Sequence, residues 1–103
     1  MMLIQLLLPS KSSTGEAILH EPIAETRAEL VKRFGGVTAF LRSPARGAWT
    51  SPQGDVEQDD VVMVEVMAPQ FDRTWWGEYA HVLAQRFGQQ SIMIRASRVS
   101  VLD

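Results

Sequence analysis

The chain has 103 residues, of which 46% are hydrophobic and 21% charged, and its formal net charge is −2 at pH 7. This size and composition predict one soluble globular domain, and the small negative charge gives no general attraction to nucleic acid or to an anionic membrane surface. The absence of cysteine excludes disulfide bonds and thiol catalysis. We expect a cytoplasmic protein with no metal, no cofactor, no nucleic-acid partner and no membrane association.

The first ten residues, MMLIQLLLPS, contain an apolar run that fits either an export signal or a β-strand. No basic residue precedes the run, Gln5 interrupts it, and no small-residue cleavage site follows it. It is also too short to cross a bilayer. We therefore interpret residues 3–8 as a first strand that ends at Pro9.

A polar loop and a helix are expected next. The segment SKSSTGE has the composition of a loop. Pro22 then suits the first turn of a helix, where its missing N–H would have no intrahelical partner, and Gly35 can end that helix in a left-handed conformation. The expected apolar stripe, with an arginine at its margin, consists of Ile23, Arg27, Leu30, Val31 and Phe34.

Residues 37–68 have the pattern of one long β-hairpin. Residues 37–42 predict a strand because they include β-branched and aromatic residues. Pro44 interrupts this strand, so we expect an edge strand with a bulge and a resumption of pairing at residues 48–50. The segment SPQGD predicts a turn, and residues 61–68, VVMVEVMA, predict the returning strand.

A second helix and a last strand complete the chain. Asp72 is a good N-cap residue, and Gly88 is suited to ending the helix that follows. Residues 91–96 predict the last strand, with a continuation as far as residue 102 left open. The apolar stripe of this helix, with 4-3-4 spacing, consists of Trp76, Ala80, Leu83 and Phe87.

The expected order of elements is therefore β-α-β-β-α-β in a single domain over residues 1–103. Right-handed crossovers and pairing of strands that are neighbours in sequence make this a ferredoxin-like α+β sandwich. Two helices would cover one face of a four-stranded antiparallel sheet with strand order 4-1-3-2. Strands one and three, LIQLLL and VVMVEVMA, would then lie in the middle of the sheet.

Alternation of side chains along the strands predicts two different sheet faces. One face is apolar throughout, as in the set Val62, Val64 and Val66, and belongs under the helices. The other face, which the helices leave open, is mixed. Here we expect Glu65 to lie near Gln5 and between Arg95 and Arg42. The apolar members of this face are Leu7, Phe40, Met63, Met67 and Met93, and its polar members are Gln5, Arg42, Glu65 and Arg95.

Three further observations bear on function. Neither His20 nor His81 has a partner at metal-ligand spacing, and we interpret both as surface residues. Trp49 stands in the protruding hairpin with little domain core to join, which favours an oligomer contact or a pocket wall. RNA-recognition modules share this order of elements, but they stack bases on aromatic residues of strands one and three. Those strands have no aromatic residue here, which argues against RNA binding.

Two stretches, RFGGVTAFLRSPARGAW (33–49) and WWGEYAHVLAQRFGQQSIMIRA (75–96), resemble a group of small bacterial proteins of unknown function. The similarity covers most of the chain from about residue 29 to residue 95, and FGGVTA is among its most specific parts. The resemblance implies a ferredoxin-like fold and no particular activity. The polar residues within these motifs that it offers for a shared site are Thr38, Arg42, Gln90 and Arg95.

Three occupants fit the mixed open face: a second copy of the chain, a small molecule held by arginines, or the hairpin itself. The leading hypothesis is a non-catalytic interaction or ligand-sensing domain that acts as a homodimer. The alternative is a cofactor-free enzyme of the dimeric α+β-barrel type, an isomerase or oxygenase acting on a small organic molecule. Glu65 would then be the general base, with Arg42 or Arg95 stabilising an anion. His20 would supply an acid.

Overall fold

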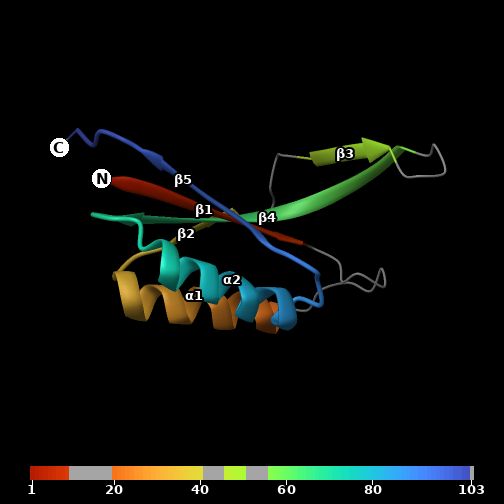
Figure 1. The fold of residues 1–103 in the computed structure, drawn as a ribbon, viewed down its shortest axis with the longest axis horizontal. Coiled ribbons are helices and arrows are strands. Elements are labelled where there is room, and N and C mark those ends of the chain that lie inside the picture. Colours follow the sequence, from red (N-terminus) through yellow and green to blue (C-terminus); the bar gives the residue numbers. More distant parts are fainter. Residues whose placement is uncertain (10–19, 41–45, 51–55, 103) are drawn as a thin grey trace.

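The computed structural model describes residues 1–9, 20–40, 46–50 and 56–102, and within these it describes residues 20, 39–40, 46–50 and 56–61 by their backbone. The described residues form two helices and five strands (Figure 1). In chain order the elements are β1 (Met2–Pro9), α1 (His20–Phe34), β2 (Thr38–Phe40), β3 (Arg46–Thr50), β4 (Val56–Ala68), α2 (Arg73–Arg86) and β5 (Met93–Arg98).

The sheet has the strand order β2-β4-β1-β5, and every pair of neighbours is antiparallel. This is the order that the sequence predicts, with β1 and β4 in the middle. The predicted count of four strands is wrong, because β3 also pairs with β4 and gives the sheet a fifth strand. With 13 residues, β4 is long enough to pair with β3 over residues 56–60 and with β2 over residues 63–65.

The predicted hairpin is therefore divided into two ladders. β2 has only three residues, fewer than the strand predicted over residues 37–42, and β3 begins at Arg46, slightly before the predicted resumption at residue 48. The segment between them, with Pro44, lies outside the described residues. β3 and the first part of β4 extend beyond the helices as an arm (Figure 1).

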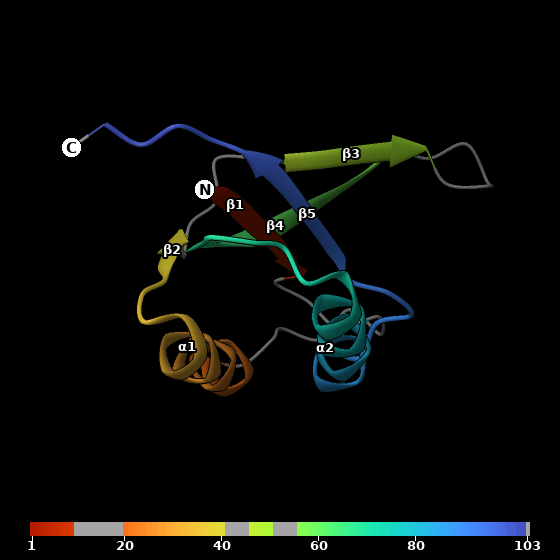
Figure 2. The ribbon, with the colours of Figure 1, turned by 60° about the vertical axis from the view of Figure 1, so that its left-hand side comes forward.

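Both helices lie on one face of the sheet, side by side (Figure 2). In the part of the chain that the structure describes, no helix covers the other face, which we call the open face. This two-layer α+β arrangement is consistent with the expected ferredoxin-like sandwich. β5 forms one edge of the sheet and begins at Met93, two residues later than the strand predicted from residue 91.

The hydrophobic core lies between the helices and the sheet. Ile4, Leu6 and Leu8 of β1 and Val64 and Val66 of β4 are completely buried. They alternate with residues of the open face, as the period of a strand requires. Because burying each such side chain stabilises the fold by about 1.5–3 kcal/mol, this pattern fixes which face of the sheet meets the helices.

α1 contributes Ile23, Thr26 and Leu30 to the core, and all three are buried. The Thr26 hydroxyl donates to a backbone carbonyl one turn earlier at 2.8 Å, which satisfies this buried polar group. The predicted stripe is wrong at Val31, whose side chain is 47% exposed. Val31 is one residue beyond Leu30, a rotation of about 100° that takes it off the buried side. Gly35 ends the helix with φ 84°, as predicted.

α2 begins at the predicted N-cap. The Asp72 carboxylate accepts a hydrogen bond from the Trp75 amide at 3.1 Å, which satisfies one of the free N–H groups of the first turn. Trp76 and Leu83 are buried as predicted, and Tyr79, whose aromatic ring favours the core over a partner surface, is buried with them. The helix thus brings two large aromatic side chains into the core.

Candidate functional site

The open face contains the residues around Glu65 that the sequence singles out. β1 and β4 form its middle, and β5 and β2 lie on either side. Residues that pair directly across neighbouring strands share a face. The members whose side chains are described are Leu3, Gln5, Leu7, Thr38, Met63, Glu65, Met67, Met93, Arg95 and Ser97.

Four polar residues lie in one row across β2, β4, β1 and β5 on this face. Thr38 pairs with Glu65, Glu65 pairs with Gln5, and Gln5 pairs with Arg95. We call this set the polar row. No sequence motif places these residues together, because the register of three strand pairs decides their alignment.

Gln5 joins the two charged members of the polar row. Its Nε2 donates to Glu65 Oε2 at 2.8 Å, and its Oε1 accepts from Arg95 Nε at 2.9 Å. Gln5 Nε2 also lies 3.4 Å from the sulfur of Met63. The amide is therefore oriented with its donor toward the carboxylate and its acceptor toward the guanidinium, as the charges favour.

Apolar residues lie on both sides of the polar row. Leu7, Met63 and Met93 form one row, and Leu3 and Met67 lie on the other side. Met67 is 41% exposed and Met93 is 60% exposed, and both are among the most exposed large hydrophobic residues of the described chain. An apolar surface with a charged line through it is typical of a contact surface rather than of a face made for water.

Most of the predicted site residues are brought together here. Glu65 lies beside Gln5, as expected, but it is not next to Arg95, because Gln5 on the central strand β1 separates them. Arg42 lies outside the described residues. The backbone of Phe40 is in register with Met63, which places Phe40 at the edge of the same apolar row.

Three other candidates do not join this cluster. His20 is the first residue of α1, which belongs to the layer on the opposite side of the sheet. Gln90 is exposed in the connection between α2 and β5. Trp49 is in β3, where its backbone pairs with Glu57 on the extended arm. Among the described residues, the open-face site therefore consists of the polar row and its apolar neighbours.

A second polar cluster, which sequence analysis did not find, joins the two helices. Arg86 binds both carboxylate oxygens of Glu29, at 2.8 and 2.9 Å, and donates to the Thr26 hydroxyl at 2.9 Å. The Tyr79 hydroxyl donates to the same carboxylate at 2.7 Å. Glu29 and Arg86 are 57 residues apart, so no local spacing could have indicated this pairing.

These contacts shift the protonation equilibria of the cluster. The hydrogen bonds from Arg86 hold the pKa of Glu29 below its ordinary value. Burial, reinforced by the negative charge of Glu29, raises the pKa of Tyr79. Glu29 therefore stays ionised and Tyr79 neutral at physiological pH, which suits a structural clamp between the helices rather than proton transfer.

The described residues offer neither a clustered set of metal ligands nor a helix that could span a membrane. They contain no group of three or more His, Cys, Asp or Glu side chains placed to hold a metal ion. None of the helices in the described ranges has the length and apolar character needed to span a bilayer.

No protein-family model and no curated protein matches this chain. Among solved structures, it is similar to a phage SAM lyase in complex with S-methyl-5′-thioadenosine, with a TM-score of 0.58 and 14% identity over 93% of this chain and 79% of that chain. The apo state of a phage SAM lyase gives a TM-score of 0.56 and 14% identity, with 93% of this chain and 78% of that chain covered. At this identity the similarity shows a shared fold.

Proposed function

We propose that this protein is a small non-catalytic interaction domain that acts as a homodimer through its open face. The observation that carries the proposal is the polar row, with Glu65 and Arg95 on opposite sides of Gln5, within an otherwise apolar surface. Single exposed methionines are ordinary on a protein surface. Here Met67 and Met93 belong to apolar rows that share one face with Arg95, and methionine and arginine are both enriched at protein–protein interfaces.

The charges of the polar row select one symmetry for the dimer. In an isologous dimer, both copies present the same surface about a two-fold axis that lies between them. An axis parallel to β1, passing above Gln5, exchanges the two sides of that strand. Arg95 of each copy then lies over Glu65 of the other, and each apolar row meets its own counterpart. An axis across the strands would instead place Glu65 over Glu65.

The atoms of the polar row that have no partner among the described side chains support the same arrangement. Within the described ranges, Gln5 occupies one oxygen of Glu65 and one nitrogen of Arg95, and no other described side chain bonds the remaining atoms. Burying a charged pair is unfavourable unless its remaining hydrogen-bonding groups are also satisfied. The second copy supplies the complementary guanidinium and carboxylate to both, which offsets the cost of removing them from water.

The proposal is tested by light scattering coupled to size exclusion over a dilution series. The double variant Met67→Lys/Met93→Lys introduces two charges on the open face and should be a monomer at concentrations where the wild type is a dimer. The matched control is Val31→Lys/Val82→Lys, which replaces two comparably exposed residues on the helices, 47% and 46% exposed. The proposal is contradicted if the wild type is a monomer, or if the Met67→Lys/Met93→Lys variant still forms the dimer.

The structural similarity favours a second candidate, a cofactor-free enzyme that acts on a small organic molecule at the same face. The neighbouring structure is a SAM lyase that holds S-methyl-5′-thioadenosine, so SAM is the first substrate to test. In this alternative Glu65 is the base and Arg95 the anion-stabilising residue. Release of S-methyl-5′-thioadenosine from SAM, measured by chromatography and lost in Glu65→Gln, would favour it. No release by the wild-type protein leaves the interaction domain as the better account.

A further inference from the structure

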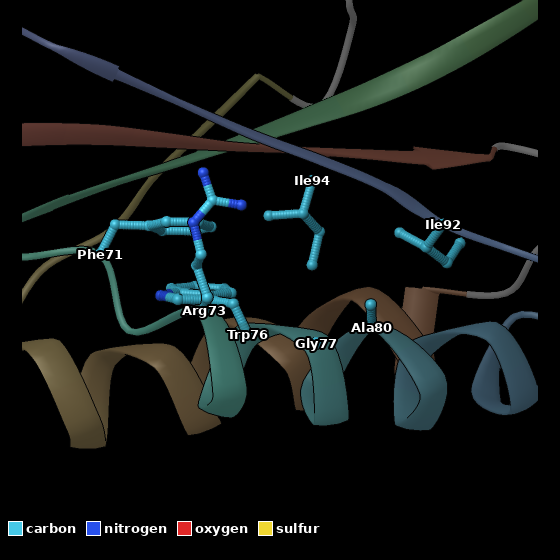
Figure 3. Close-up of a pocket in the computed structure, with 7 residues that line it drawn as sticks. All are labelled: Phe71, Arg73, Trp76, Gly77, Ala80, Ile92 and Ile94. Carbon is cyan, nitrogen blue, oxygen red and sulfur yellow. The ribbon is translucent and has the colours of Figure 1, made fainter.

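A second candidate site lies on the helix side of the sheet, away from the open face. It is a shallow pocket of about 180 Å³ between α2 and β5 (Figure 3). Phe71 and Trp76 lie at one end, and Ile92 and Ile94 form the sheet side. The walls are therefore apolar and partly aromatic. The α2 side is completed by Arg73, Gly77 and Ala80.

Gly77 lines the pocket without a side chain, at a position where the helix gains nothing from glycine. Glycine in a helix interior costs about 1 kcal/mol relative to alanine. Here φ is not positive, and an added Cβ would meet no atom within 4 Å beyond its own turn and adjacent residues. Neither backbone geometry nor close packing in the described structure explains this glycine. A residue that lowers helix propensity and gains no compensating contact is often found at a functional position.

Arg73 supplies a positive charge at the same pocket. Its guanidinium lies over the Phe71 ring, 5.9 Å from the ring centroid, and its side chain rises from α2 toward the sheet beside the pocket (Figure 3). Arg86 is bound to Glu29, and Arg95 to Gln5. Arg73 has no carboxylate partner among the side chains that the structure describes, so its planar donors are available to an anion.

We propose that this pocket binds a small apolar carboxylate, with a ring or short chain against Trp76 and Ile94 and the carboxylate on Arg73. The volume fits one ring, because a cavity of about 150 Å³ suffices for benzene. The apolar walls exclude ligands that are polar throughout, and the single cation selects an anionic head group. This site shares no residue with the proposed dimer interface, so the two proposals stand or fall separately.

The test uses sodium benzoate as the probe, followed by amide chemical shifts of the full chain in two-dimensional NMR. Benzoate should shift the amides of Arg73, Gly77 and Ile94, and neutral benzamide should bind about tenfold more weakly. Arg73→Gln should abolish this preference for the anion. Arg27→Gln removes an exposed arginine on α1 and should change neither affinity.

Two substitutions at Gly77 separate filling of the pocket from stabilisation of the helix. Gly77→Ala and Gly77→Leu both improve helix propensity, but only leucine is large enough to occupy the pocket. Benzoate should bind the alanine variant like the wild type and the leucine variant at least about tenfold more weakly. Ala80→Leu fills the same space from the next turn and should have the same effect. The proposal is overturned if benzoate shifts none of the pocket amides, or if both leucine variants bind it normally.

Discussion

At the scale of single residues, Arg86 has the largest number of polar contacts in the described structure. Its side chain is only 13% exposed and serves Glu29, Thr26 and Glu25 on α1. We predict that Arg86→Met lowers the free energy of unfolding by about 1–3 kcal/mol, because a charge-assisted, bidentate contact is lost and its partners become unpaired. Urea unfolding measures this. Arg27→Met, at an exposed site on α1, should change stability by less than about 0.5 kcal/mol. Equal effects of the two substitutions would show that the contacts of Arg86 contribute nothing to stability.

The lowered pKa of Glu29 predicts a specific pH dependence. A carboxyl whose pKa is lower in the folded than in the unfolded state stabilises the fold above its ordinary pKa, here 4.5, and loses that contribution as the pH falls through the folded-state value. Glu29→Gln should therefore be less stable than the wild type at pH 7, and the difference should shrink as the pH falls below 4.5. Urea unfolding from pH 7 to pH 3 follows this change. A difference that stays constant over this range would show that the ionisation of Glu29 does not contribute.

At the scale of elements, the two helical glycine positions predict opposite effects of the same substitution. Gly35 has φ 84° at the end of α1, where alanine would be strained, whereas Gly77 lies within α2 with open space around it. Gly77→Ala should stabilise the protein by about 0.5–1 kcal/mol, and Gly35→Ala should destabilise it by about 1–2 kcal/mol. Thermal unfolding of both variants shows whether each substitution raises or lowers the melting temperature. Destabilisation by Gly77→Ala would mean that α2 is already strained at this turn.

The elements also show how far the sequence predicts the fold. The alternation of residues in LIQLLL and VVMVEVMA identifies the two central strands and their buried faces, because successive side chains of a strand point to opposite faces of the sheet. The helix caps at Asp72 and Gly35 are equally local signals. Pro44 also predicts the interruption between β2 and β3. The bounds of these two strands are not readable in this way, because they depend on how far β4 extends past the helices.

The candidate site is predictable in composition but not in geometry. Alternation correctly places Gln5, Glu65 and Arg95 on the open face, since that requires only the direction of each side chain. The predicted strand order already places Glu65 near Gln5, as the pairing of β1 with β4 confirms. The exact pairing of Gln5 with both Glu65 and Arg95 depends on register, which sequence leaves uncertain by about two residues. The contact between Glu29 and Arg86 is also not predictable from local sequence, because it joins two helices whose relative position is set by their packing on the sheet.

At the scale of the whole molecule, β5 separates the two proposed sites. Ile94 faces the pocket beside α2, whereas its neighbours Met93 and Arg95 belong to the open face. Adjacent residues of one strand point to opposite sides of the sheet. Substitutions at Met93 or Arg95 should therefore alter assembly without filling the pocket, and Gly77→Leu should weaken benzoate binding without changing the oligomeric state.

The symmetry proposed for the dimer makes a prediction that involves both copies at once. If Arg95 of each copy lies over Glu65 of the other, Glu65→Arg and Arg95→Glu should each place like charges together and weaken the dimer by at least about tenfold. The double variant Glu65→Arg/Arg95→Glu restores opposite charges across the interface. Gln5 can accommodate it by rotating its amide, since one end donates and the other accepts. Its dimer should therefore approach wild-type affinity, with a coupling free energy of about 0.5–3 kcal/mol. Sedimentation equilibrium of the wild type, the two single variants and the double variant gives the dimer dissociation constants for this double-mutant cycle. A two-fold axis parallel to β1 is excluded if the single variants dimerise normally, or if their effects on the dimerisation free energy simply add in the double variant.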